Sequence, residues 1–144
     1  MTTLALDVGD RRIGIAISDP TGFLVRPLTV LVRRSNQLHV AALRRIVDEN
    51  DVKLIVAGLP LTDEGELSEQ AEKILPFVRL LRKKLSVPVE TWDETFTTRD
   101  AQEELIAQGI RRRRRGELLD AAAAAVLLTS WLTAHHPPLP PSVL

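Results

Sequence analysis

The chain has no cysteine, which excludes disulfide bonds and metal sites built on thiolates. It also has no long hydrophobic run. The longest uninterrupted apolar stretch, residues 121–128, has eight residues, against the roughly 20 needed to span a bilayer. The opening residues carry no charged region followed by an apolar stretch, so no signal peptide is expected. We therefore expect a cytoplasmic protein that does not bind membranes.

The formal net charge is zero, because 19 basic residues balance 19 acidic residues. A balanced total argues against a protein that coats nucleic acid indiscriminately, but the charges are distributed unevenly. Residues 63–72 are rich in acids, whereas five consecutive arginines occur at Arg111, Arg112, Arg113, Arg114 and Arg115. Such asymmetry is expected of a protein with one surface that faces nucleic acid. The alternative is that the arginine run is only a solvated loop.

The 144 residues suffice for one domain with a hydrophobic core. We predict a single domain over residues 1–136, followed by a flexible proline-rich tail over residues 137–144. Within the domain, residues 3–8 and 13–18 alternate between apolar and small or polar side chains, and the short connector between them predicts an antiparallel hairpin. A third strand is expected near residues 24–32. Pro27 places that strand at a sheet edge or bulge, since proline has no N–H to donate.

Helical spacing then alternates with strands along the rest of the chain. Helices are predicted over residues 36–50, 66–85, 98–108 and 117–134, and strands over residues 54–57 and 87–92. Pro76 lies inside the second helix, so a kink or two shorter helices are expected there. The predicted order is βββαβαβαα. It indicates an α/β fold with a five-stranded mixed sheet and helices on both faces.

Several carboxylates lie where predicted elements end. Asp7 lies at the end of the first strand, on a face otherwise built from the small residues Ala5, Gly14 and Ala16. Small side chains allow another element to approach closely, and the alanine-rich segment 121–125 is suited to that position. Such docking would bring Asp120 towards Asp7.

A third acidic position, Asp93 with Glu94, ends the fifth strand. Because alternate residues of a strand face opposite ways, only one of the two can point into a shared site. Carboxylates are the ligands that Mg²⁺ and Mn²⁺ prefer, and phosphoryl chemistry commonly uses two such ions about 4 Å apart. Taken singly, each acid has an ordinary explanation as a turn former, a solvated loop residue or a helix-start acid.

Four segments, taken in order, resemble the motifs of the YqgF/RuvX family. They are Leu-Asp-Val-Gly-Asp-Arg-Arg-Ile-Gly-Ile-Ala-Ile-Ser-Asp at residues 6–19, Val-Ala-Gly-Leu-Pro-Leu at 56–61, Asp-Glu-Thr-Phe-Thr-Thr at 93–98 followed by Ala101, and Leu-Asp-Ala-Ala-Ala-Ala at 119–124. The resemblance runs from residue 4 to about residue 132. The family comprises Holliday-junction-resolvase-like proteins that are also regarded as nucleases of precursor 16S ribosomal RNA.

The resemblance implies a ribonuclease H-like fold and a nuclease that depends on Mg²⁺ or Mn²⁺. It implies that Asp7, Glu94 and Asp120 are the catalytic, metal-binding acids, with Asp93 as the alternative to Glu94. The family usually has arginine where this chain has Thr95, so the phosphate contact expected there must come from elsewhere. The candidate contacts to nucleic acid are Arg11, Arg12, Arg99 and the run Arg111 to Arg115.

Three classes of function stay open at this point. The first is an endonuclease that acts on branched DNA or structured RNA. The second is a nucleotide-binding kinase or ATPase, because an Asp-x-Gly hairpin also occurs in actin-like phosphate loops, although that architecture normally needs two such domains. The third is a non-catalytic ribosome assembly factor that binds nucleic acid. A resolvase that cuts two symmetric strands would be a homodimer, whereas a trimming nuclease could be a monomer.

Overall fold

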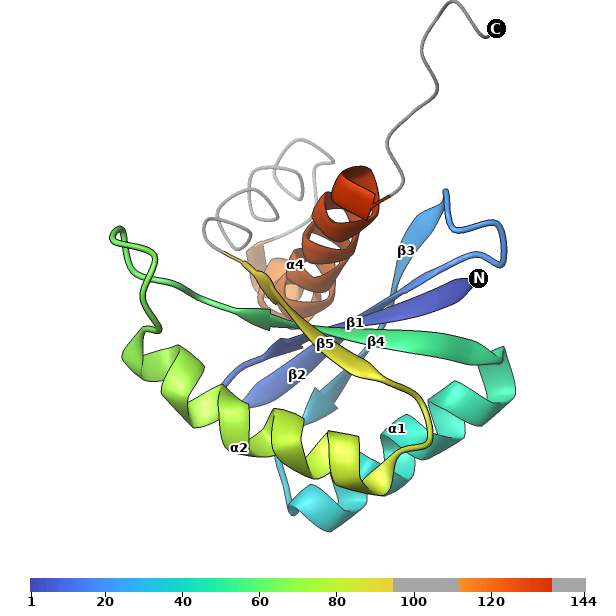
Figure 1. The fold of residues 1–144 in the computed structure, drawn as a ribbon, viewed down its shortest axis with the longest axis horizontal. Helices are drawn as coiled ribbons and strands as arrows, with labels where there is room; N and C mark the ends of the chain where they lie inside the picture. Colours follow the sequence, from blue (N-terminus) through green and yellow to red (C-terminus); the bar gives the residue numbers. More distant parts are fainter. Residues whose placement is uncertain (95–111, 136–144) are drawn as a thin grey trace, which may run out of the picture.

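The computed structural model describes residues 1–94 and 112–135, the latter as backbone only up to residue 118 (Figure 1). The helix predicted over residues 98–108 and the predicted tail lie outside the described residues. No helix in the described part is both long and apolar enough to cross a membrane. The elements in chain order are β1 (Thr2–Val8), β2 (Arg12–Ser18), β3 (Val25–Val32), α1 (Asn36–Asn50), β4 (Val52–Leu59), α2 (Glu69–Lys84), β5 (Val89–Asp93) and α4 (Arg112–His135).

The five strands form one mixed sheet in the order β3-β2-β1-β4-β5. β1 pairs antiparallel with β2 and parallel with β4, and β5 pairs parallel with β4. The predicted hairpin is confirmed, and the N–H of Gly9 closes its turn by donating to the carbonyl of Arg12 at 2.9 Å. β3 is an edge strand, and its register against β2 shifts where Ala16 pairs with Pro27. Pro27 therefore lies both on an edge strand and at an irregularity in the strand register, the two positions expected for it.

Helices cover both faces of the sheet, as predicted: α1 and α2 lie on one face and α4 on the other (Figure 1). The larger core lies between the sheet and the α1–α2 layer. The smaller core lies under α4 and consists of Ala5, Ala16, Leu54, Val56, Ala124, Leu127, Leu128, Trp131 and Leu132. The small residues on β1 and β2 face the large ones on the helix. The α4 backbone can therefore come close to β1 and β2.

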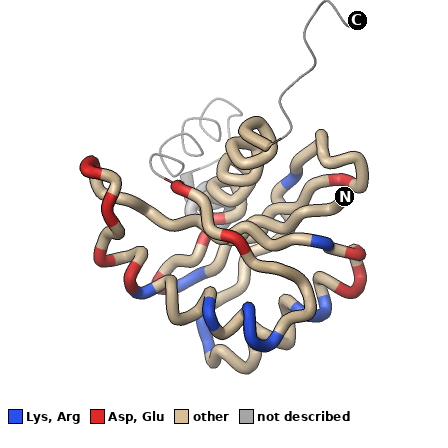
Figure 2. The backbone as a smooth tube through the Cα atoms, viewed as in Figure 1, with Lys and Arg blue, Asp and Glu red and all other residues tan. Residues whose placement is uncertain are grey.

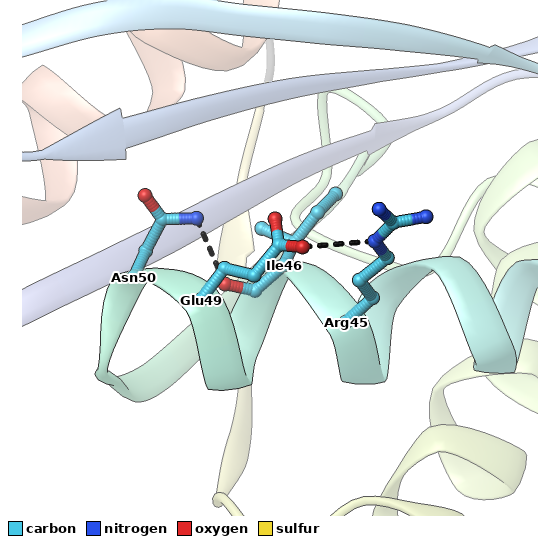
Figure 3. A network of polar contacts seen from close by, with 4 residues as sticks. All are labelled: Arg45, Ile46, Glu49 and Asn50. Atoms are coloured by element: carbon cyan, nitrogen blue, oxygen red, sulfur yellow. Dashed lines mark hydrogen bonds and ion pairs between the residues drawn. The ribbon is translucent and has the colours of Figure 1, made fainter.

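Helix α1 occupies the predicted residues, and local contacts define its ends. The Ser35 side chain caps the first turn by accepting from a backbone N–H of that turn. Near the other end, Arg45 Nε lies 2.8 Å from Glu49 Oε1, and Asn50 Nδ2 donates to the Ile46 carbonyl at 2.9 Å (Figure 3). An exposed pair of this spacing stabilises a helix by only about 0.3–0.5 kcal/mol. These contacts therefore shape the helix end and contribute little to the stability of the fold.

Helix α2 differs from the prediction in two respects. It begins at Glu69 and not at residue 66, because the Ser68 side chain accepts from the N–H of Ala71 at 3.1 Å and caps the helix there. It also runs without interruption through Pro76, so of the two alternatives expected there, a kink or two shorter helices, the second is wrong. Residues on both sides of the proline, including Ile74 and Phe77, are buried against the sheet. Their burial outweighs the hydrogen bond that the proline cannot make.

Helix α4 begins at Arg112, five residues before the predicted start at residue 117. The arginine run is therefore not a loop, because four of its five residues lie in the first turn or so of this helix. Arginine is a strong helix former, and Gly116 costs only about 1 kcal/mol inside a helix. That cost is too small to make the helix begin only after Gly116, because the buried second half of the helix stabilises it.

Both tryptophans of the chain lie near the C-terminal end of α4. Trp92 on β5 donates from Nε1 to the hydroxyl of Ser130 at 3.1 Å. The His135 ring stacks on the Trp131 ring with centroids 4.1 Å apart and meets the Trp92 ring edge-on at 5.3 Å. This aromatic cluster fastens the end of α4 to β5.

Candidate active site

The strand face under α4 carries the small residues needed for close approach. A Cβ on Gly14 would collide with the carbonyl of Asp120 and would lie 2.7 Å from the backbone nitrogen of Ala121. The α4 backbone thus lies directly on β2 at the point where β2 pairs with the end of β1. The predicted docking of the alanine-rich segment on this face is confirmed.

Asp7 lies on β1 opposite Gly14, near the strand end, and is half-buried. Its carboxylate accepts a hydrogen bond from the carboxyl group of Glu94. Two acids that are 87 positions apart in the sequence therefore meet at the same edge of the sheet. Asp120 on α4 is close enough for its charge to act on Asp7.

A glycine on β4 makes room for Glu94. A Cβ on Gly58 would lie 2.7 Å from the Cδ atom of Glu94 and would overlap one of its carboxyl oxygens. The backbone of Glu94 is held by its N–H, which donates to the Leu59 carbonyl at 3.2 Å. Sequence reasoning gave Gly58 no role. The signal that could have revealed it was a glycine within an otherwise apolar, buried strand, which often marks a close approach.

The pKa values of the Asp7 and Glu94 carboxyl groups are both raised above their ordinary values. Burial raises the pKa of Glu94 to about 9, and the charge of Asp7, the hydrogen bond to Asp7 and the charge of Asp93 act in the same direction. Burial also raises the pKa of Asp7; the hydrogen bond from Glu94 opposes this rise, and the charge of Asp120 adds to it. Glu94 is therefore the protonated partner and Asp7 the acceptor.

Asp120 is bound by an arginine that the sequence predicted to contact nucleic acid. Arg12 Nε lies 2.8 Å from Asp120 Oδ2, and the two side chains are 41% and 25% exposed. Arg12 is the first residue of β2, directly after the hairpin turn. Asp120 lies more than two turns inside α4, so a role as a helix-start acid no longer applies to it.

The remaining predicted site residues are placed as follows. Asp93 is exposed, whereas Glu94, the other member of the pair, faces Asp7. Arg11 is exposed in the hairpin turn, and Arg112, Arg113, Arg114 and Arg115 begin α4. Arg99 and Arg111 lie outside the described residues. Figure 2 shows a further group of basic residues along α2, on the face of the sheet opposite α4.

Within residues 1–94 and 112–135, no three acidic or histidine side chains are already grouped as metal ligands. Two of the candidate acids bind each other through a proton, and the third binds Arg12. The donor set nevertheless fits a hard divalent cation. It offers carboxylate oxygens from three elements, and two of the acids have a raised pKa because their negative charges are crowded and poorly solvated. A bound cation would relieve that crowding and displace the shared proton.

Comparison with known proteins gives one family and several close relatives. The family described as RuvX, Holliday junction resolvase, matches residues 1–134. A protein of Desulforudis audaxviator named "Putative pre-16S rRNA nuclease" is 40% identical over 134 residues, which cover 93% of this chain and 95% of the relative. A protein of the same name from Clostridium novyi is 39% identical and covers 82% of this chain and 87% of its own length.

Solved structures share the fold at much lower identity. Thermus thermophilus RuvC in complex with a Holliday junction substrate matches with a TM-score of 0.59 and 19% identity, covering 95% of this chain and 97% of that one. Fowlpox virus resolvase in complex with Holliday junction DNA matches with a TM-score of 0.58 and 14% identity, covering 94% and 99%. These matches confirm the predicted ribonuclease H-like fold.

Proposed function

The chain belongs to the family described as RuvX, Holliday junction resolvase, and from that premise we propose that it is a metal-dependent endonuclease acting on structured nucleic acid in the cytoplasm. The observation that carries the proposal is the meeting of Asp7 and Glu94 at one sheet edge, with Asp120 beside them on α4. Acids from three separate elements, in a site that raises the pKa of two of them, are typical of phosphodiester hydrolysis assisted by divalent cations.

The chain's own residues would contribute as follows. Asp7, Glu94 and Asp120 would hold Mg²⁺ or Mn²⁺, which when bound activates a water molecule and neutralises charge on the phosphate. Glu94 must give up its proton before it can act as a ligand, and Gly58 leaves the space in which its carboxylate lies. Asp93, being exposed, contributes negative charge near the site and is not proposed as a ligand.

The proposed physiological substrate is precursor 16S ribosomal RNA. The relatives that carry that name are about 40% identical over most of the chain, whereas the resolvases solved with junction DNA are under 20% identical. A branched DNA junction is the competing substrate. It would require a two-fold symmetric dimer to cut two equivalent strands, whereas an enzyme that trims RNA can act as a monomer.

The test is a cleavage assay with both substrates side by side. Purified protein is incubated with a precursor 16S RNA fragment and with a four-way DNA junction, in Mg²⁺, in Mn²⁺ and in EDTA, and its mass in solution is measured by sedimentation. The proposal predicts cleavage that requires the metal, is faster on the RNA, and is lost in Asp7→Asn. Binding of either substrate without cleavage in any metal would instead support the non-catalytic assembly factor.

A further inference from the structure

The ion pair between Arg12 and Asp120 places a fixed positive charge on an acid that the proposed function needs as a metal ligand. We propose that Arg12 binds Asp120 while the site holds no cation and releases it to a divalent cation, after which its guanidinium contacts a phosphate of the nucleic acid. This inference rests on the proposed function. It adds an exchange step for which the chain supplies both partners.

The backbones on both sides of the ion pair are fixed, so the exchange involves only side chains. Arg12 follows a hairpin turn that the Gly9 N–H closes onto the Arg12 carbonyl at 2.9 Å. The carbonyl of Asp120 packs on Gly14 so closely that a Cβ there would collide with it. Both backbones are held by these contacts, so rotation of a side chain is the simplest way to break the 2.8 Å contact.

The exposure of the pair suits an exchange. Arg12 is 41% exposed and Asp120 is 25% exposed, so both charges remain partly hydrated. An ion pair of this kind contributes little net stability, and another partner can displace it easily. A divalent cation held also by Asp7 and Glu94 is a stronger partner for Asp120 than a half-exposed guanidinium. The guanidinium fork is in turn well matched to a phosphate, which it can bind through two parallel hydrogen bonds.

The exchange predicts that Arg12 has opposite effects on the binding of the cation and on the binding of the nucleic acid. It competes with the cation for Asp120, so its removal should strengthen metal binding. It contacts the nucleic acid once released, so its removal should weaken binding of the substrate. An arginine that only held Asp120 in the geometry of a ligand would have the opposite effect on the metal.

Mn²⁺ binding to the protein without nucleic acid tests the first effect, measured by electron paramagnetic resonance of free Mn²⁺ or by calorimetry. We expect Arg12→Gln to bind Mn²⁺ about three- to fivefold more tightly than the parent, the range set by the small free energy of a half-exposed pair. The matched control is Arg11→Gln. It removes the same charge from the neighbouring residue, whose side chain is exposed. The gain in Mn²⁺ affinity of Arg11→Gln should be less than half of the gain of Arg12→Gln.

Two further variants assign the effect to the pair. In an Asp120→Asn background, where no ion pair can form, Arg12→Gln should leave Mn²⁺ affinity unchanged. Arg12→Lys keeps the charge and should stay closer to the parent than Arg12→Gln does. With a non-cleavable oligonucleotide in place of substrate, Arg12→Gln should bind about threefold more weakly in the presence of Ca²⁺, as expected when one phosphate contact is removed.

The outcomes separate this inference from the proposed function. Unchanged or weaker Mn²⁺ binding by Arg12→Gln would overturn the exchange, as would an equal gain in Arg11→Gln, and the metal site itself would stand. If the parent protein bound no Mn²⁺, the proposed metal site would be wrong and the exchange would fall with it.

Discussion

The carboxyl group of Glu94 occupies the space into which a side chain at position 58 would project: its Cδ lies 2.7 Å from where a Cβ on Gly58 would stand. Gly58→Ala should therefore push the Glu94 carboxyl group away from Asp7. Because the obstacle is the end of a flexible side chain, the free energy of unfolding should fall by only about 1 kcal/mol. Cleavage should fall by about tenfold or more, as expected when a metal ligand is displaced. Urea unfolding and the cleavage assay measure the two effects.

Gly14→Ala provides the contrast, since its new Cβ meets the backbone of Asp120 and Ala121 and not a side-chain end. Moving a packed helix should cost more, about 2–3 kcal/mol. Equal stability losses in the two variants would contradict the close contact between β2 and α4.

Asp7→Asn should abolish most cleavage and leave the protein folded. Loss of a metal ligand typically costs several kcal/mol of transition-state stabilisation, so we expect cleavage to be about a hundredfold slower or more. Without metal at neutral pH, the free energy of unfolding should stay the same or rise, since a poorly solvated charge is removed. Asp10→Asn is the matched control in the adjacent exposed turn, and it should cleave normally. Normal cleavage by a folded Asp7→Asn protein would refute the proposed site.

The neighbours Asp93 and Glu94 should behave differently. Glu94 faces Asp7 and Gly58, whereas Asp93 is exposed, so Glu94→Gln should lose cleavage and Mn²⁺ affinity. Asp93→Asn should change both by less than about threefold, since its side chain is exposed and solvent and salt screen its charge. Titration of Mn²⁺ into each variant gives the comparison. The reverse ranking would make Asp93 the ligand.

Stability without metal should depend on pH in a direction that burial of Glu94 sets. The folded protein keeps a proton on Glu94 up to about pH 9, whereas the unfolded chain releases it near its ordinary pKa of 4.5. The folded state thus binds more protons between these values, and the free energy of unfolding must fall as pH rises from about 5 to about 9. The slope cannot exceed about 1.4 kcal/mol per pH unit for one proton.

Urea unfolding in EDTA at several pH values measures that slope. Glu94→Gln cannot release the proton, so its stability should depend less on pH, and it should be more stable than the parent at about pH 9. Identical slopes in parent and variant would mean that Glu94 titrates normally in the folded protein.

The arginine run at the start of α4 should contribute to affinity and little to turnover. Replacing Arg112, Arg113 and Arg114 with alanine should weaken binding to many sequences alike. Each arginine that contacts a phosphate contributes about −0.9 to the slope of log affinity against log salt on duplex DNA. If two or three of these side chains reach phosphates in the parent, the slope of the variant should be flatter by roughly 2 units. Binding to a junction and to a structured RNA across a salt series measures it.

A control of equal charge is available on the other face of the sheet. Arg79, Lys83 and Lys84 are exposed on α2, where Figure 2 shows a concentration of basic residues. Their replacement with alanine removes three charges on the face opposite α4 and should leave the salt slope nearly unchanged. If both triple variants flattened the slope equally, the run would contribute only through net charge.

Sequence patterns predicted most of the fold, because alternation in β1 and β2 and helical spacing in α1 each specify one buried face. They also predicted the docking of α4, since small residues on two strands and a run of alanines are complementary in shape. The start of α4 was missed because helix propensity continues through the arginines, and no local signal marks the first turn.

The finer features of the candidate site could not be predicted from the sequence. The hydrogen bond between Asp7 and Glu94 depends on the pairing of β1 with β4 and of β4 with β5, which together set the register of two distant segments. The pairing of Arg12 with Asp120 depends on where along β2 the helix lies. Both are consequences of tertiary packing, whereas periodicity and motif spacing report only on each segment.

The aromatic cluster at the end of α4 gives the protein an intrinsic optical probe of the helix that carries Asp120. The chain has two tryptophans and no tyrosine, and both indole rings contact His135. Selective excitation of indole therefore reports on one location, the junction of α4 with β5. Separation of that helix from the sheet would free both rings at once. The tryptophan emission spectrum can thus show in real time, without an attached dye, whether α4 is packed against the sheet.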